Sequence, residues 1–234
     1  DGSILTEADT AMQTRIAGKL QQLSPDILFL GEEMEADVQA GLLESGQPVW
    51  CLDPLDGTSN FACGIPYYCV ALALLHKGHV ELGLVYDPVR DECFSAVHGE
   101  GARLDGKPLQ VSDSGLALGQ AIALIDLKRL DAGLATRLVT DMPYASQRSF
   151  GSVALDWCWL AAGRCHVYLH GRSKIWDYAA GNFIFDTAGG FSTTLQGGAV
   201  FTPALTPRSS VAAVDRSLFQ AWTAWLDIET SLPG

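Results

Sequence analysis

The sequence has no long apolar run and little positive charge. No segment approaches the roughly 18 consecutive apolar residues of a membrane-spanning helix: the run from Tyr67 to Leu75 soon meets His76 and Lys77. We therefore expect no membrane partner. The 15 lysine and arginine residues are scattered and the net charge is −12, whereas binding to a phosphate backbone requires clustered positive charge. We therefore expect no nucleic-acid partner.

The sequence also lacks a paired-cysteine motif. Its six cysteines form no CxxC pair and lie mostly within apolar runs, which fits buried free thiols better than a disulfide framework or a zinc site. Free thiols favour a reducing compartment, so we predict a cytoplasmic protein. The chain opens at Asp1 without a charged leader and apolar stretch, so the sequence shows no signal peptide. We expect that an upstream N-terminal segment is missing.

The composition is that of a globular protein. The 234 residues are 48% hydrophobic and 18% charged, which is enough apolar material for a large core. No repeat, linker or low-complexity tract divides the chain. We predict a single domain over residues 1–234, with sub-regions of about 1–111 and 112–234.

The first elements lead into acidic residues. Residues 10–23 carry apolar side chains at helical spacing after Thr6-Glu7-Ala8-Asp9, which has the form of a capping box. A helix is therefore predicted from Glu7 to about Ser24. Short apolar runs at residues 27–30 and 49–52 predict buried strands, and each ends at an acidic cluster.

The remaining elements follow from apolar runs between turn residues. An antiparallel meander is predicted for residues 68–75, 80–86 and 92–97. The stretch from Gly99 to Lys107 is rich in glycine and aspartate. The second half alternates predicted strands at 121–125, 165–169 and 211–214 with predicted helices at 152–162, 177–188 and 218–228.

Asp53 and Asp56 are the strongest candidates for a metal site. Pro54 and Leu55 separate them at the end of a predicted strand, and a turn there would aim both carboxylates and the Leu55 carbonyl at one point. Mg²⁺ prefers such oxygen ligands. The string 57–60 follows, where a helix could begin and bind phosphate through its free N–H groups. Adjacent metal and phosphate sites are therefore predicted.

Each feature also has an ordinary structural explanation. The string 53–58 is compatible with a turn that carries capping residues. Glu32 and Glu33 after a strand could form a solvated loop. Asp177, which follows Trp176 at a predicted helix start, would be favoured there by the helix dipole alone. Only the combination and order of these features point to chemistry.

That combination is specific. Four strings occur in order, namely Thr6-Glu-Ala-Asp9, Gly31-Glu32-Glu33, Trp50-Cys-Leu-Asp53-Pro-Leu-Asp56-Gly-Thr58-Ser-Asn-Phe61 and Trp176-Asp177-Tyr-Ala-Ala-Gly181. With Gly151-Ser152 before a predicted helix, the pattern resembles the inositol monophosphatase family over nearly the whole chain. The resemblance implies an α+β fold, the layered αβαβα sandwich of the inositol monophosphatase and fructose-bisphosphatase type. It implies a lithium-sensitive phosphoric monoester hydrolase that acts on a small phosphorylated metabolite.

The resemblance further implies roles for individual residues. Two to three Mg²⁺ ions would be held by Glu32, Asp53, the Leu55 carbonyl, Asp56 and Asp177. Glu32, Thr58 and Asp9 would be catalytic and orient a metal-activated water that attacks phosphorus in line. Asp9 would also cap its helix. Phosphate and substrate contacts would come from Asp56, Gly57, Thr58, Ser59, Gly151, Ser152 and His170.

His170 departs from the family pattern. Inositol-specific members carry an acidic residue there, six positions before the tryptophan that matches Trp176. An imidazole cannot accept hydrogen bonds from two hydroxyls as a carboxylate does, so inositol phosphate is not expected to be the preferred substrate. The alternative for His170 is a surface histidine in the loop 169–174. Arg172 and Lys174 could instead meet a second anionic group.

Several functions therefore stay open. Within enzymes, the alternatives are a phosphatase for 3′-phosphoadenosine 5′-phosphate, fructose 1,6-bisphosphate or histidinol phosphate. A different class is a non-catalytic metal-binding regulatory protein on the same scaffold. The family resemblance also implies a homodimer, for which Phe150, Trp157 and Trp159 supply apolar contact residues.

Overall fold

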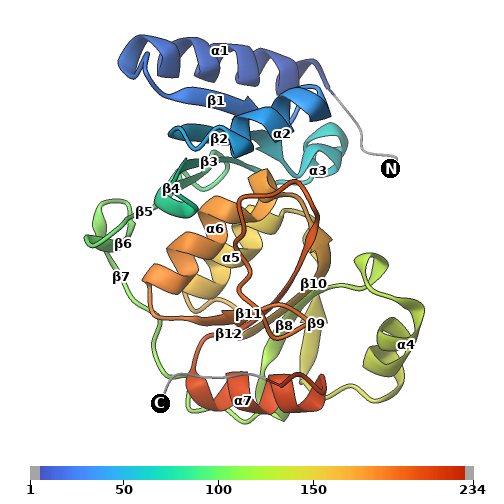
Figure 1. The fold of residues 1–234 in the computed structure, drawn as a ribbon. Coiled ribbons are helices and arrows are strands. Elements are labelled where there is room, and N and C mark those ends of the chain that lie inside the picture. The colour runs from blue at the N-terminus through green and yellow to red at the C-terminus, as the bar shows by residue number, and fades with distance from the viewer. Residues whose placement is uncertain (1–5, 230–234) are drawn as a thin grey trace.

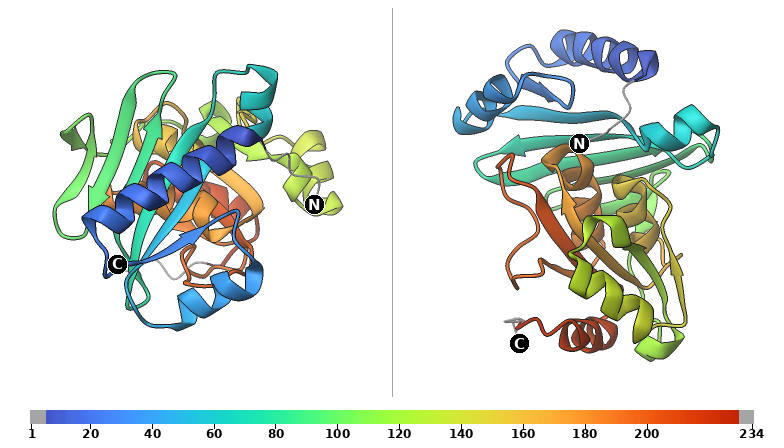
Figure 2. Two further views of the ribbon diagram at one scale, coloured as in Figure 1. Left: turned by 90° about the horizontal axis from the view of Figure 1, so that it is seen from above. Right: turned by 90° about the vertical axis from the view of Figure 1, so that its right-hand side faces the viewer.

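Two β-sheets alternate with layers of helices in an α+β sandwich (Figure 1). The computed structural model of the protein describes residues 6–229. From the end that holds the N-terminal helix, the layers are α1 and α2, the first sheet, α5 and α6, the second sheet, and α7 (Figure 2). The predicted αβαβα sandwich is confirmed.

The outer layer begins with α1 (Glu7–Leu23). Thr6 is its N-cap, and Asp9 accepts hydrogen bonds from the Thr6 backbone N–H at 2.8 Å and the Thr6 hydroxyl at 2.5 Å. This is the predicted capping box, which satisfies N–H groups that lack helical partners. The helix ends at Leu23 with Ser24 as its C-cap, close to the predicted end. A second helix, α2 (Ala36–Glu44), packs on β1.

The first sheet holds its strands in sequence order. They are β1 (Leu28–Gly31), β2 (Val49–Asp56), β3 (Cys69–His76), β4 (His79–Asp87), β5 (Glu92–Val97), β6 (Gly101–Leu104) and β7 (Lys107–Leu109). Only β1 and β2 pair in parallel. In β3 every second residue is buried, which is the period expected of a strand with two different faces. The short helix α3 (Thr58–Cys63) directly follows β2.

The middle layer consists of α5 (Val153–Ala161) and α6 (Ile175–Thr187). These helices are apolar on nearly all sides because α6 packs on both α5 and the first sheet, and α5 packs on the second. Their contact is close: a Cβ on Gly181 would lie 2.8 Å from the Trp157 Cβ atom and 3.0 Å from the Ala154 carbonyl oxygen. Glycine is therefore required where α6 crosses α5.

The second sheet has the strand order β11-β12-β10-β8-β9. Its strands are β8 (Ile122–Asp126), β9 (Ser146–Arg148), β10 (Val167–Ser173), β11 (Phe191–Thr193) and β12 (Arg208–Ala213). The 3₁₀ turns η1 (Leu118–Gln120) and η2 (Leu127–Arg129) flank β8. Helix α7 (Arg216–Trp225) packs on β10, β11 and β12, and α4 (Ala132–Thr140) lies beside it (Figure 1). In residues 6–229 no helix is long and apolar enough to cross a membrane.

The predicted strands and helices are all present, with bounds that shift by a few residues. Three differences matter. The stretch from Gly99 to Lys107 mostly forms β6, the turn after it and the start of β7. The prediction that Asp53 and Asp56 flank a turn after the strand is wrong, because β2 continues to Asp56. Trp157 is fully buried in the monomer, so it cannot contribute to a subunit contact as predicted.

Candidate active site

A bulge in β2 brings Asp53 and Asp56 to the same side of the strand. Asp53 pairs with Ala71 and Asp56 with Cys69 across β3, so three steps along β2 match two along β3. In a regular strand, residues three apart point to opposite faces. One extra residue restores them to one face, and a bulge is also where a strand tolerates Pro54, which has no N–H.

Asp56 joins the first sheet to the middle helix layer. Its Oδ2 atom accepts hydrogen bonds from the Ser152 hydroxyl and the Ala154 backbone N–H, both at 2.7 Å. These donors lie at the N-terminus of α5, where a carboxylate is stabilised by free N–H groups and the helix dipole. Ser152 is only 1% exposed. Its hydroxyl therefore orients Asp56.

Asp9 and Thr58 meet although 49 residues separate them. The Thr58 hydroxyl oxygen lies 2.9 Å from Asp9 Oδ1 and 2.9 Å from the Leu55 carbonyl oxygen, and it donates its one hydrogen to either. Asp9 is 1% exposed. The structure thus brings together the predicted carboxylate and hydroxyl, and Asp9 serves as the helix cap at the same time.

Glu32 and Asp177 approach the same region from two other elements. Glu32 follows β1, where its backbone N–H donates to the Leu52 carbonyl of β2. Asp177 lies in the first turn of α6 and accepts a hydrogen bond from the Lys174 backbone N–H at 2.8 Å. Asp177 is therefore both a helix cap, as its ordinary explanation requires, and a neighbour of the other acids.

The four acidic side chains repel one another. Burial, then the charges of Glu33 and Asp56, raises the pKa of Glu32 to about 7. Burial, followed by the charges of Glu32, Asp56 and Asp177, raises the pKa of Asp53 well above its usual value. Burial, followed by the charges of Asp56 and Glu32, raises the pKa of Asp177, whereas hydrogen bonds from Ser152 and Ala154 partly offset the effect of burial on Asp56. A bound cation would stabilise the ionised form of these buried acids.

The donor set fits Mg²⁺ in chemistry. Carboxylate oxygens of Glu32, Asp53, Asp56 and Asp177 and the Leu55 carbonyl are hard oxygen ligands, and burial together with mutual repulsion raises the pKa of the acids. As the side chains stand, however, residues 6–229 contain no group of three or more His, Cys, Asp or Glu side chains arranged to hold a metal ion. One oxygen each of Asp53, Asp56 and Asp177 accepts a backbone N–H instead.

The predicted phosphate residues lie around the start of α3. Gly57 is its N-cap with φ of 96°, and an added Cβ would lie 3.0 Å from the Tyr67 carbonyl oxygen, so this position requires glycine. Ser59 is exposed. Gly151 lies beside α3 because the Asn60 side-chain amide donates to the Tyr67 and Phe150 carbonyls at 2.7 and 2.6 Å. Phosphate contact by these residues stays a prediction.

His170 is not a surface histidine. It lies on β10, is 4% exposed, and its Nε2 atom is 3.5 Å from Asp126 Oδ2. Burial raises the pKa of Asp126, but His170 and Lys128, through their hydrogen bonds and charge, together lower it below its usual value. The loop alternative is therefore wrong, since β10 extends four residues beyond the predicted end at Leu169.

Sequence reasoning missed the roles of Asn60 and Asp126. Asn60 stands inside the Asp-Gly-Thr-Ser-Asn string, which was the available signal. Asp126 ends the strand predicted at 121–125, which pairs in parallel with β10 in the structure, and side chains at the carboxyl ends of parallel strands often face a ligand. Its partner His170 comes from β10, which sequence spacing does not reveal.

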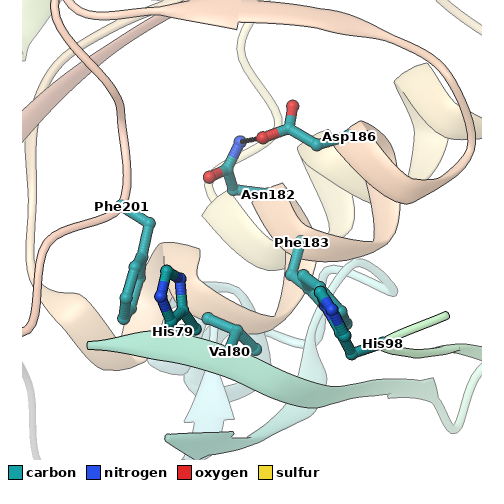
Figure 3. A pocket seen from close by; sticks show the side chains of 7 residues that line it. All are labelled: His79, Val80, His98, Asn182, Phe183, Asp186 and Phe201. Atoms are coloured by element: carbon teal, nitrogen blue, oxygen red, sulfur yellow. Dashed lines mark hydrogen bonds between the residues drawn. The ribbon is translucent and has the colours of Figure 1, made fainter. Parts of the chain in front are cut away.

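A small cavity of about 180 Å³ lies away from these residues, between the start of β4, the end of β5 and α6 (Figure 3). Its lining residues are His79, Val80, His98, Asn182, Phe183, Asp186 and Phe201. The figure shows the two histidines apart, on either side of Val80. None of the predicted site residues lines this cavity, so the candidate active site is the region around Asp53.

Comparison with known proteins decides the family. The model of the inositol monophosphatase family matches residues 1–226. The chain belongs to the inositol monophosphatase family. Among curated relatives, Nus factor SuhB of Pasteurella multocida is 36% identical over 220 residues, which cover 91% of this chain and 78% of that protein. Inositol monophosphatase 1 of Solanum lycopersicum is 38% identical over 194 residues, 80% of this chain and 70% of that protein.

Solved structures of the family share the fold. The extragenic suppressor protein suhB of Bartonella henselae has a TM-score of 0.81 and 28% identity over 95% of this chain and 85% of that chain. SaIMPase-II with inositol monophosphate bound has a TM-score of 0.80 and 28% identity over 94% and 84%. As a member of the inositol monophosphatase family, the protein is a phosphatase, a phosphoric monoester hydrolase.

Proposed function

We propose that the protein hydrolyses a small phosphate monoester in a Mg²⁺-dependent reaction at the site around Asp53. The observation that carries this proposal is the gathering of buried acids from β1, β2 and α6 beside the Asp9–Thr58 pair. Stability alone does not favour such a group, because buried like charges are costly without cations. A similar protein of known structure binds inositol monophosphate, which supports a small phosphorylated substrate for this protein.

The proposed role of each residue follows from its position. Glu32, Asp53, the Leu55 carbonyl, Asp56 and Asp177 would hold two to three Mg²⁺ ions. Bound Mg²⁺ supplies a Lewis acid that lowers the pKa of water and neutralises phosphate charge. Glu32 and Thr58 would orient the attacking water, and Asp9 would hold the Thr58 hydroxyl in place. Backbone N–H groups at Gly57, Thr58 and Ser59 would bind phosphate oxygens.

Four further properties belong to this proposal. Lithium should inhibit, because Li⁺ is close to Mg²⁺ in size but has half its charge.

A homodimer would use Phe150 and Trp159, which are partly exposed and in contact with each other. A single monomer-sized species in sedimentation at micromolar concentration would contradict the homodimer. A cytoplasmic location fits six cysteines that are all free, and a disulfide in the purified native protein would argue against it. Gly151 and Ser152 would contact the substrate through their backbone groups, because the Ser152 hydroxyl already donates to Asp56.

The alternatives are not better supported. Some relatives carry the name Nus factor. A regulatory role is therefore the second candidate function for this chain. Phosphatases for 3′-phosphoadenosine 5′-phosphate, fructose 1,6-bisphosphate or histidinol phosphate would use the same acids. His170 is engaged with Asp126, which again disfavours inositol phosphate as the preferred substrate.

Phosphate release from a substrate panel tests the proposal. The panel contains inositol 1-phosphate, fructose 1,6-bisphosphate, 3′-phosphoadenosine 5′-phosphate, histidinol phosphate and glycerol 2-phosphate, each with Mg²⁺, with chelator, and with Mg²⁺ plus millimolar Li⁺. We expect turnover only with Mg²⁺, inhibition by Li⁺ that added substrate does not overcome, and at least a roughly hundredfold loss in Asp53→Asn. Turnover in chelator, or wild-type turnover in the variant, would reject the metal assignment.

A further inference from the structure

Arg129 lies at the carboxyl end of one of two neighbouring parallel strands. Strand β8 ends at Asp126 and η2 continues to Arg129. Strand β10 runs parallel to β8, with His170 in register with Asp126. Beyond its end, β10 leads directly into α6 and Asp177. The segment with Arg129 therefore lies beside the segment that delivers an acid to the candidate active site.

Close backbone packing fixes this segment. A Cβ on Gly171 would lie 1.9 Å from the Arg129 carbonyl oxygen and 3.1 Å from the Leu130 Cα atom. Because both contacts are with backbone, no side-chain movement would relieve them, and η2 reaches β10 only where the strand has glycine. The position of Arg129 is thus set by the fold and is not that of a free loop residue.

The guanidinium of Arg129 has no partner among residues 6–229. Arg90 pairs with Asp87 and Arg164 with Glu92, whereas Arg129 makes no hydrogen bond, ion pair or ring contact within the described chain. It is partly buried. It lies near enough to Asp177 for the two opposite charges to interact.

The two acids nearest in sequence are already engaged. Asp131 caps α4, where its side chain accepts the Leu134 N–H. Asp126 Oδ2 lies 3.5 Å from His170 Nε2 and 3.9 Å from the Lys128 ammonium, and its Oδ1 accepts the Lys128 backbone N–H. Arg129 therefore has its five N–H donors available. A guanidinium binds a carboxylate or a phosphate through two parallel hydrogen bonds, which gives both affinity and orientation.

We propose that Arg129 is a specificity-determining residue that binds a second anionic group of the substrate, so that the substrate class is a phosphate monoester that carries a further carboxylate or phosphate. This inference rests on the proposed function, because it assumes that the reacting phosphate lies at the acids around Asp53. It assigns to Arg129 the role that sequence reasoning considered for Arg172 and Lys174. Arg172 is exposed, and the Lys174 ammonium lies over the Trp176 ring at 5.9 Å.

A matched pair of substrates tests it. Glycerol 2-phosphate and 2-phosphoglycerate differ only in that one hydroxymethyl group is replaced by a carboxylate. With Mg²⁺, wild-type protein should show a kcat/KM at least about tenfold higher for 2-phosphoglycerate, since hydrogen bonds to charged groups are worth more than neutral ones. In Arg129→Gln this preference should fall at least about tenfold, mostly through a higher KM for 2-phosphoglycerate. Fructose 1,6-bisphosphate against fructose 6-phosphate repeats the comparison for a second phosphate.

Two control variants complete the design. Lys128→Gln removes the neighbouring cation, whose side chain is 72% exposed, and Arg172→Gln removes the exposed guanidinium that follows Gly171 on β10; both should keep the wild-type preference. An unchanged preference in Arg129→Gln, a wild-type protein that hydrolyses both members of each pair equally, or loss of the preference in Arg172→Gln instead would overturn the inference. Absence of turnover on every substrate with Mg²⁺ would reject the proposed function itself.

Discussion

Glu32 and Glu33 are adjacent in sequence but lie in different environments. Glu32 is partly buried and faces the other acids, so burial and the charges of Glu33 and Asp56 raise its pKa to about 7. Glu33 is exposed, and its pKa is raised less, by partial burial and by Asp9. The ordinary explanation of a solvated loop is therefore correct for Glu33 and wrong for Glu32.

The two glutamates provide a matched test of the site. Glu32→Gln should lower kcat at least about tenfold, because the amide keeps the size of the side chain but removes a metal ligand and an acceptor for the attacking water. Glu33→Gln should remain within about twofold of wild type. Phosphate release at saturating Mg²⁺ measures both. Equal effects of the two substitutions would remove Glu32 from the proposed machinery.

At the residue scale, the sequence predicted the acids better than their partners. Asp53, Asp56 and Asp177 stand in strings whose order is specific, so their gathering was predictable. The burial of His170 was not, because it depends on Asp126 in a neighbouring strand. The Ser152 hydroxyl likewise serves Asp56, 96 residues away, and no local pattern indicates that.

At the element scale, close contacts constrain α6 on two sides. Gly83 on β4 and Gly181 on α6 both stand at close backbone contacts: a Cβ on Gly83 would lie 2.8 Å from the Ala180 carbonyl oxygen. Helix α6 is thus held between the first sheet and α5. Because α6 also carries Asp177, its packing sets the position of one acid of the site.

Two helical glycines should respond to alanine with opposite signs. Gly181→Ala should reduce the free energy of unfolding by about 1–3 kcal/mol, because the methyl group meets the Trp157 Cβ atom and the Ala154 carbonyl. Gly18→Ala on the exposed side of α1 meets nothing within 4 Å and should raise it by about 0.5–1 kcal/mol, as alanine is the better helix former. Denaturant unfolding measures both changes. Equal stabilisation by the two substitutions would contradict the packing described for α6.

The elements that sequence reasoning did not predict are short. Helices α2 and α4 are nine residues each, and each has one buried side chain, Gln39 in α2 and Leu138 in α4. Strands β9 and β11 are three residues long. They exist because neighbouring strands of the second sheet supply hydrogen-bond partners, which is tertiary information. Longer elements such as α1, which has a capping box, and β3, which alternates buried and half-buried residues, were predictable.

At the scale of the whole molecule, the candidate active site joins layers that are distant in sequence. Glu32 and Asp53 come from the first sheet, Asp177 from α6, and Asp9 from the outer helix α1. Like charges at this junction oppose the packing of these layers on one another, in a chain whose net charge is already −12. A cation bound there would link the layers, so ion binding and global stability should be coupled.

Magnesium should therefore raise the thermal unfolding midpoint, and Asp53→Asn should separate stability from activity. At about 100 times its dissociation constant a ligand adds about 2.7 kcal/mol, which for a chain of this size corresponds to roughly 5–10 °C. In Asp53→Asn the amide oxygen can still accept the Leu55 N–H, while one buried charge is gone. The ion-free variant should be at least as stable as ion-free wild type, yet gain little from Mg²⁺.

Scanning calorimetry at pH 8 with and without Mg²⁺ measures the change in the unfolding midpoint. Asp227→Asn, at a side chain that is 76% exposed, is the control and should show the same Mg²⁺ shift as wild type. A Mg²⁺ shift in Asp53→Asn as large as that of wild type would mean that the ion binds elsewhere and that the junction of layers is not its site.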